Sequence, residues 1–131
     1  MIPKFRAWDT TKKEMFKDTF AITESGQVVV VDQSSVFVSP DYVFVDNLVI
    51  MQSTGLKDKN GKEIFEGDIL KNNKYITSVF YEDGAYRVKF CRTLNTTVTM
   101  NVISFIEKYK TRTVGNIYEN PELLEVKSEI F

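Results

Sequence analysis

Apolar residues along this chain recur at every second position or in short unbroken runs, which is the pattern of β-strands. Four stretches are rich in Val, Ile, Tyr, Phe and Thr and are punctuated by Gly, Pro, Asn and Asp. They are GQVVVVD (26–32), SSVFVSPDYVFVDNLVIMQ (34–52), KYITSVFYEDGAYRVKF (74–90) and RTVGNIYE (112–119). Because such residues favour a pleated, half-buried surface, the pattern predicts a mainly β protein.

The clearest local feature is a hairpin centred on Asp83-Gly84. This dipeptide suits the positive-φ positions of a two-residue hairpin turn. In the strand that follows, over residues 86–90, apolar and aromatic side chains alternate with Arg87 and Lys89. The alternation predicts one buried face and one solvated face for this strand.

Helical periodicity is confined to two short stretches. After Asn101, which suits an N-cap, apolar residues follow at i, i+3, i+4 and i+7 and predict one helix. These residues are Val102, Phe105, Ile106 and Tyr109. The alternation of apolar residues over 98–102 predicts a strand instead, and both alternatives stay open here. A second helical turn is expected within 119–125, with Asn120 as N-cap and Pro121 at the first helical position.

The composition is that of one folded domain. The chain has 131 residues, of which 43% are hydrophobic, with ten Phe and six Tyr, so a single core can be filled. No internal repeat, low-complexity run or linker marks a boundary. We expect one domain over 1–131, with an N-terminal β region over 1–50, a barrel over 51–120 and a tail over 121–131.

The chain lacks the groups of several common active sites. It has no histidine and one cysteine, Cys91. Ser-His-Asp, Cys-His and histidine-zinc sites therefore lose their usual group, and no internal disulfide can form. The start of the chain has no signal-peptide pattern, and no apolar run reaches the length of a bilayer span. We expect a cytoplasmic protein that is not an enzyme, with no cofactor and no membrane partner.

The stretch TGLKDKNGKEIFEGDIL contains both turn-forming and acidic residues. Asn60-Gly61 is the second strong hairpin dipeptide of the chain. The charged residues around it, Asp58 among them, suit a solvated loop tip. We therefore predict a turn here.

The acidic part of the same stretch is a candidate metal site. Glu66 and Asp68 flank Gly67 and, if the segment is extended, project from one face about 7 Å apart. With Glu63 they offer the ligands of a metal-dependent enzyme. The alternative is a bulge or tight approach at Gly67, with the carboxylates solvated or paired to lysines. This alternative is favoured, because no further ligand, base or nucleophile stands at a diagnostic spacing.

The middle of the chain is basic. Residues 71–112 contain eight Lys and Arg against three acidic residues, a net charge of +5 in a chain of net charge −1. Small β-barrels bind nucleic acid through a basic groove with stacked aromatic rings. The tyrosines in this region are Tyr75, Tyr81, Tyr86 and Tyr109. The candidate nucleic-acid-binding residues are Lys71, Lys74, Arg87, Lys89 and Arg92. The alternative, which is favoured, is that the charges solvate an outer face while the tyrosines fill the core or its rim.

Four blocks resemble, in order, those of the YopX family of phage and prophage proteins: IPKFRAWDTTKKEM, QSTGLKDKNGKEIFEGDIL, VFYEDGAYRV and VGNIYENPELL. The resemblance covers almost the whole chain. It implies an origin in a phage or prophage of a bacterial host, and a mainly β fold with a small barrel of the SH3-like type. It implies no catalytic residues, because the function of the family is unknown. The segment over 20–47 is where this chain is expected to differ from its relatives.

Three functional hypotheses follow. The first is a non-enzymatic accessory protein whose barrel binds a host or phage protein, with self-association as a further expectation. The apolar run over 36–51, which needs cover, the tail LLEVKSEIF and Trp8 are candidate contacts. The tail is equally able to pack on its own barrel, and a lone Trp is more often a core residue. The second is a nucleic-acid-binding barrel that uses the basic 71–112 surface. The third is the metal-dependent enzyme described above.

Overall fold

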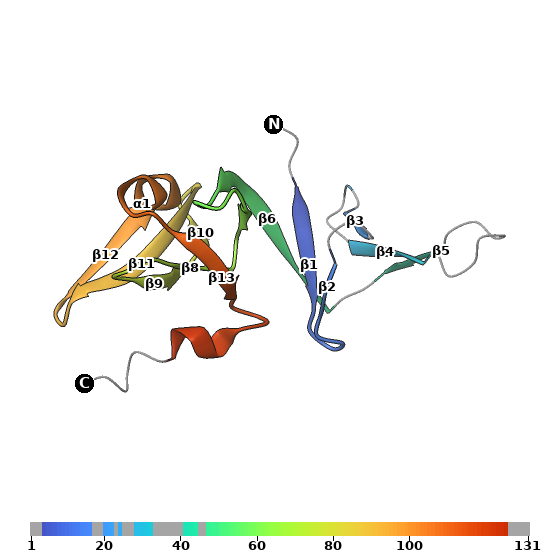
Figure 1. The fold of residues 1–131 in the computed structure, drawn as a ribbon. Helices are drawn as coiled ribbons and strands as arrows, with labels where there is room; N and C mark the ends of the chain where they lie inside the picture. The colour runs from blue at the N-terminus through green and yellow to red at the C-terminus, as the bar shows by residue number, and fades with distance from the viewer. Residues whose placement is uncertain are drawn as a thin grey trace. The chain divides into compact units, whose positions relative to one another are not determined.

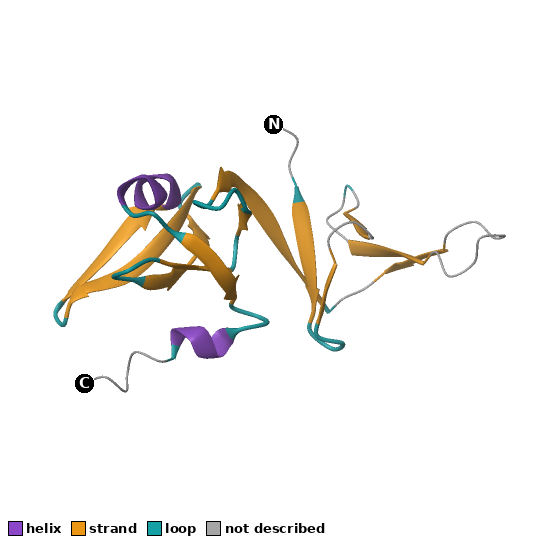
Figure 2. Ribbon diagram, viewed as in Figure 1, coloured by secondary structure: helices purple, strands orange, loops and turns teal. Residues whose placement is uncertain are grey.

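The computed structural model describes residues 4–16, 20–22, 24, 28–32, 41–44 and 47–125. Strands dominate these residues (Figure 2), so the prediction of a mainly β protein is confirmed. The chain divides into two compact units, an N-terminal unit over Lys4–Met51 and a C-terminal unit that takes in Gln52–Phe131. The predicted contacts of the tail at Val126, Ile130 and Phe131 lie outside the described residues.

The N-terminal unit is built from antiparallel pairs. β1 pairs with β2, and β4 lies between β3 and β5. Along β1, the side chains of Arg6, Ala7, Trp8 and Asp9 are all buried. Trp8 is therefore a buried residue of β1 and not an exposed anchor. The strands of this unit are β1 (Phe5–Asp9), β2 (Glu14–Phe16), β3 (Phe20–Ile22), β4 (Val28–Asp32), β5 (Asp41–Phe44) and the first part of β6 (Leu48–Lys57).

The C-terminal unit contains short curled sheets and one α-helix (Figure 1). β6 pairs with β7, β8 lies between β13 and β9, and β11 lies between β10 and β12. The elements after β6 are β7 (Glu63–Phe65), β8 (Asp68–Lys71), β9 (Ile76–Ser78), β10 (Phe80–Glu82), β11 (Ala85–Thr93), β12 (Thr96–Asn101), α1 (Val102–Lys108), β13 (Arg112–Asn116) and a 3₁₀-helix, η1 (Pro121–Leu124). This pairing is compatible with a small barrel, and its SH3-like type stays a prediction.

The core of the C-terminal unit is formed by side chains that the periodicity places inward. Val88 and Phe90 of β11 are buried whereas Lys89 between them is exposed, as their alternation predicts. The α1 residues Val102 and Phe105 are fully buried against them. The buried cluster is Ile64, Leu70, Val79, Val88, Phe90, Val102 and Phe105.

The predicted hairpin at Asp83-Gly84 is confirmed. β10 and β11 pair with Glu82 opposite Ala85, so the loop has two residues. Asp83 has φ of 52° and Gly84 has φ of 82°, the left-handed conformations that such a turn requires. Both alternatives over 98–109 are also present, because β12 ends at Asn101 and α1 begins at Val102.

The second helical turn differs in detail from its prediction. Residues Pro121–Leu124 form a 3₁₀-helix, and the Asn120 side chain does not cap it. Instead the Asn120 Oδ1 accepts a hydrogen bond of 3.3 Å from the Asn116 N–H, which turns this side chain back toward β13. A short Pro-initiated turn can form without a side-chain cap, because the proline lacks one of the N–H groups that need an acceptor.

Candidate functional site

Three turns of the C-terminal unit meet at one end of the β8–β13 pair. The turn after β6 is joined to the segment before β13 by the Lys59 N–H, which donates to the Thr111 carbonyl at 3.0 Å. The turn after β8 is joined to the same segment by the Asn72 Nδ2, 3.4 Å from the Thr111 Oγ1. Lys71 and Arg112 are direct cross-strand partners in β8 and β13. Segments far apart in sequence are thus held together by backbone and side-chain hydrogen bonds and by strand pairing.

These turns and the adjoining ends of β8 and β13 carry a concentration of positive charge, which we call the basic end. All its side chains are exposed. Within the described ranges, none of them is in an ion pair. The basic end consists of Lys59, Lys62, Lys71, Lys74, Lys110 and Arg112.

The one carboxylate of the same turns is buried and occupied. The Asp58 Oδ1 accepts hydrogen bonds of 2.9 Å from the N–H groups of Asn60 and Lys62, and its Oδ2 accepts one of 2.9 Å from the Thr113 N–H. Burial raises the pKa of Asp58, but the hydrogen bonds from these three residues outweigh it, so the net pKa lies below the ordinary 3.8. The expectation that Asp58 is solvated at a loop tip is wrong, because it serves as the acceptor that closes the turn.

Two half-buried tyrosines border the basic end. Tyr75 ends the turn after β8, where the Asn72 side chain accepts hydrogen bonds from the N–H groups of Lys74 and Tyr75. Tyr109 follows α1, and the two ring centroids are 5.3 Å apart in an edge-on arrangement. The Tyr75 ring also lies 4.4 Å from that of Phe90 in the core. The basic end therefore adjoins two aromatic rings that the core holds in place.

The five predicted nucleic-acid-binding residues divide into two groups. Lys71 and Lys74 lie at the basic end. Arg87, Lys89 and Arg92 lie on β11. Lys89 and Arg92 are exposed, whereas Arg87 is half-buried.

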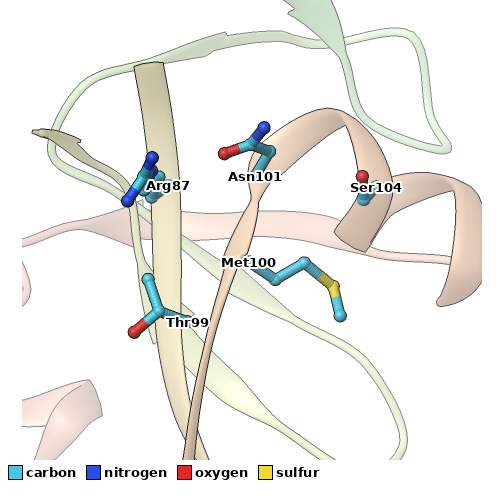
Figure 3. Close-up of a pocket in the computed structure, with 5 residues that line it drawn as sticks. All are labelled: Arg87, Thr99, Met100, Asn101 and Ser104. Atoms are coloured by element: carbon cyan, nitrogen blue, oxygen red, sulfur yellow. The ribbon is translucent and has the colours of Figure 1, made fainter. Parts of the chain in front are cut away.

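Arg87 lines a shallow pocket beside β12. Its Nη1 is 3.4 Å from the Glu82 Oε1, a long contact for an ion pair, and its Nε has no hydrogen-bond partner among the described residues. In Figure 3, Met100 and Ser104 lie on the opposite side of β12 from Arg87. The pocket is thus a depression across the strand rather than an enclosed cavity. Its lining residues are Arg87, Thr99, Met100, Asn101 and Ser104.

Of the acidic candidates Glu63, Glu66 and Asp68, two accept hydrogen bonds from groups of the fold. Glu63 accepts a hydrogen bond from the Ser53 hydroxyl, and the buried Asp68 accepts one of 2.8 Å from the Phe65 N–H. Glu66 and Gly67 form a turn, with φ of 88° at Gly67, so the segment is not the continuous strand that a shared face requires. Among the described residues, no group of three acidic or cysteine side chains is placed to hold a metal. The metal hypothesis stays a prediction, and the residues described supply it with no third ligand.

Glu66 acts on a neighbouring tyrosine. Burial raises the pKa of Tyr86, and the negative charge of Glu66 raises it further, because both disfavour the phenolate. Tyr86 also contacts Tyr81, with ring centroids 5.1 Å apart. Tyr86 therefore stays protonated and is a poor candidate for a base.

The site residues predicted from the sequence did not include Lys59, Lys62, Lys110 and Arg112. Lys59 and Lys62 lie outside the basic middle of the chain, and Lys110 and Arg112 stand at its end. Their partners in space are set by hydrogen bonds between residues as far apart as Lys59 and Thr111. The runs KDKNGK and KYKTR carry the only sequence signal, which is several lysines or arginines at turns.

Comparison with known proteins places the chain in a family. Residues 4–125 match the YopX protein family. The chain belongs to the YopX family. A solved structure, that of protein EF1440 from Enterococcus faecalis, is 35% identical and superposes with a TM-score of 0.60, covering 95% of this chain and 99% of that one. No match is found among curated proteins.

The family membership confirms the resemblance and supplies no activity. The YopX family is one of unknown function, so the chemistry must be argued from the residues of this chain. In the described part of the chain, no helix has the length and apolar character needed to cross a bilayer.

Proposed function

We propose that this YopX-family chain is a non-enzymatic accessory protein of a phage or prophage, acting in the host cytoplasm, whose basic end binds single-stranded nucleic acid. The observation that carries the proposal is the placement of six exposed cations on three hydrogen-bonded turns and on the adjoining ends of β8 and β13, none paired with a described acid. Unpaired Lys and Arg side chains bind phosphates and release counterions from the strand. Cations already paired with carboxylates would first have to give up those partners.

The burial of Asp58 favours a polyanionic partner. An exposed carboxylate among these cations would repel phosphates, but Asp58 is only 7% exposed and its oxygens accept backbone N–H groups. Its carboxylate accepts the hydrogen bonds that close the turn on which Lys59 and Lys62 lie. The positive charge of the basic end is therefore left facing solvent.

A single strand fits this surface better than a duplex. Readers of the major groove place an exposed polar or basic helix face, or a two-stranded ribbon, against base edges. The one described α-helix, α1, has seven residues and exposes Ile103, Ser104 and Glu107 beside Lys108. Turns that carry lysines around aromatic rings are instead typical of surfaces that follow a single strand.

The proposal is tested with charge-reversal pairs. Lys71→Glu with Lys74→Glu should weaken binding of a labelled single-stranded oligonucleotide by at least tenfold at low salt, measured by fluorescence anisotropy. Contact with about four phosphates predicts a slope of log K against log salt near −3, and the double variant should flatten it by about 1.4. Lys12→Glu with Lys13→Glu, two exposed lysines of the turn after β1, is the matched control and should retain binding.

A third pair tests the residues on β11. Lys89→Glu with Arg92→Glu should weaken binding less than the pair at the basic end. Equal losses from all three pairs would mean that only the net charge of the chain matters, and no binding by the wild-type protein at low salt would contradict the proposal.

Protein binding with self-association is the second candidate function. Leu94 is 84% exposed, Tyr81 is 55% exposed and Ile103 is 48% exposed, so large apolar groups face solvent on the C-terminal unit. β12 is also an edge strand of its sheet in the described structure, and such edges pair readily with other strands. Light scattering on the samples used for titration tests this candidate: a mass of one chain, 15.1 kDa, would exclude a homo-oligomer.

A further inference from the structure

We propose that Tyr109 is a base-stacking platform and that it makes the basic end selective for unpaired bases. This inference rests on the proposed function and adds to it the residue that distinguishes a single strand from a duplex. Phosphate contacts alone cannot make that distinction, because both forms present phosphates. A ring with one face held by the core and another open to solvent can make it, since only an unpaired base can be turned onto it.

The core side of Tyr109 is well fixed. Its N–H donates to the Phe105 carbonyl at 2.9 Å, which sets the backbone directly after α1. Its ring centroid is 5.3 Å from that of Phe105 and 5.3 Å from that of Tyr75, and 6.3 Å from that of Phe90. A ring held by three aromatic neighbours stacks on a base without first losing conformational entropy.

A lysine side chain lies over the outer side of the Tyr109 ring. The Nζ of Lys108 lies over the Tyr109 ring, 5.7 Å from its centroid, and Lys108 is an exposed residue. An exposed, hydrated ammonium group can occupy that position only if this side of the ring is accessible from solvent. A base that stacks there displaces the ammonium group sideways, where it can contact the adjoining phosphate.

The residues flanking Tyr109 supply further cations. Lys110 and Arg112 follow it, and Thr111 between them is bonded to the turn that carries Lys59. A stacked nucleotide would therefore have cations on both sides along its backbone. Base stacking and phosphate binding would then occur on the same short segment.

Tyr81 provides an internal comparison. Unlike the half-buried Tyr109, it is an exposed tyrosine of the C-terminal unit, 55% accessible, with its ring 5.1 Å from that of Tyr86. However, Glu82 and Asp83 follow it in the chain and both are exposed. These carboxylates repel phosphates, so Tyr81 offers a ring without the surrounding charge.

The test compares three variants on two probes, an oligothymidylate and a blunt-ended duplex without unpaired bases, at equal phosphate concentration. An oligomer of about twelve nucleotides suffices, since single-strand sites span roughly 4 to 16 nucleotides. Tyr109→Leu should weaken single-strand binding about tenfold, the loss expected for one stacked base, while leaving the duplex affinity and the salt slope unchanged. Tyr109→Phe should bind like the wild type because it keeps the ring, and Tyr81→Leu should also be unchanged.

A second measurement does not depend on the folding of a variant. In the wild-type protein, the Tyr109 ring protons should shift upfield in NMR spectra when the oligothymidylate is added, because a stacked base shields them. Unchanged ring protons, or equal losses on both probes in Tyr109→Leu, would overturn the inference while leaving phosphate binding at the basic end intact. Absence of all binding by the wild-type protein would contradict the proposed function as well.

Discussion

Asp9, Asp58, Asn72 and Asn116 perform the same task at four turns. Each side-chain oxygen accepts hydrogen bonds from backbone N–H groups a few residues ahead, as Asp9 does from Thr11 and Lys12 at 2.9 Å each. Short polar side chains are suited to this task because they reach their own backbone without strain. Three of these residues lie in the blocks that carry the YopX resemblance. We infer that those blocks specify turns rather than a catalytic centre.

Asp58 should be the most costly of these residues to replace, because it accepts from three backbone N–H groups. Asp9 accepts from two backbone N–H groups and from the Asn47 side-chain amide. Asp58→Ala removes the buried acceptor of three backbone N–H groups, and a loss of about 3 kcal/mol in the free energy of unfolding is expected. Urea unfolding at neutral pH measures this loss.

The same residue predicts a pH dependence. The folded-state pKa of Asp58 is lowered from 3.8, because its hydrogen bonds together outweigh the burial that raises it. A depressed pKa stabilises the folded state fully above about pH 4, and this stabilisation is lost as the pH falls through the folded-state pKa. Between pH 6 and pH 3 the wild type should therefore lose more stability than Asp58→Ala. Parallel pH profiles for the two proteins would contradict this role.

Two glycines occupy positions in the C-terminal unit that exclude a side chain for different physical reasons. Gly84 has φ of 82° in the β10–β11 turn, and a Cβ there would meet no atom within 4 Å. Gly115 lies in β13 under the Asn120 side chain, where a Cβ would stand 2.4 Å from the Asn120 Oδ1 and 3.0 Å from its Cβ. The first position excludes side chains by backbone conformation and the second by contact.

This difference predicts unequal effects of the same substitution. Gly84→Ala should cost about 1 kcal/mol, the penalty of a left-handed conformation. Gly115→Ala should cost about 2 kcal/mol, because the Asn120 side chain must move aside and give up the hydrogen bond that its Oδ1 accepts from the Asn116 N–H. Chemical denaturation compares the two, and a larger loss for Gly84→Ala would contradict the assignment of the contact.

The pattern of neighbouring residues in the sequence was sufficient to predict several elements of the C-terminal unit. The Asp83-Gly84 hairpin, the inward face of β11 and the α1 helix all follow from residues adjacent in sequence. The basic end could be predicted only in part, through Lys71 and Lys74. Its other cations are brought there by the β8–β13 pairing and by the Asp58 to Thr113 hydrogen bond, across 55 residues. No periodicity or dipeptide signal encodes such a contact.

For the molecule as a whole, charge placement matters more than net charge. The chain carries 17 basic and 18 acidic residues, so its total charge favours no polyanion. At the basic end, however, six cations face solvent while Asp58 is buried. Because electrostatic attraction is screened within about 10 Å at 0.1 M salt, a strand approaching this end responds to the local charge and not to the total.

The most direct test of the basic end is an NMR titration of the labelled wild-type protein with an oligothymidylate at low and physiological salt. We expect chemical-shift changes confined to the three turns, at Lys59, Asn72, Tyr75, Tyr109 and Lys110, which diminish as salt rises. Changes confined to the β11–β12 hairpin around Leu94, or an unchanged spectrum at low salt, would contradict this expectation.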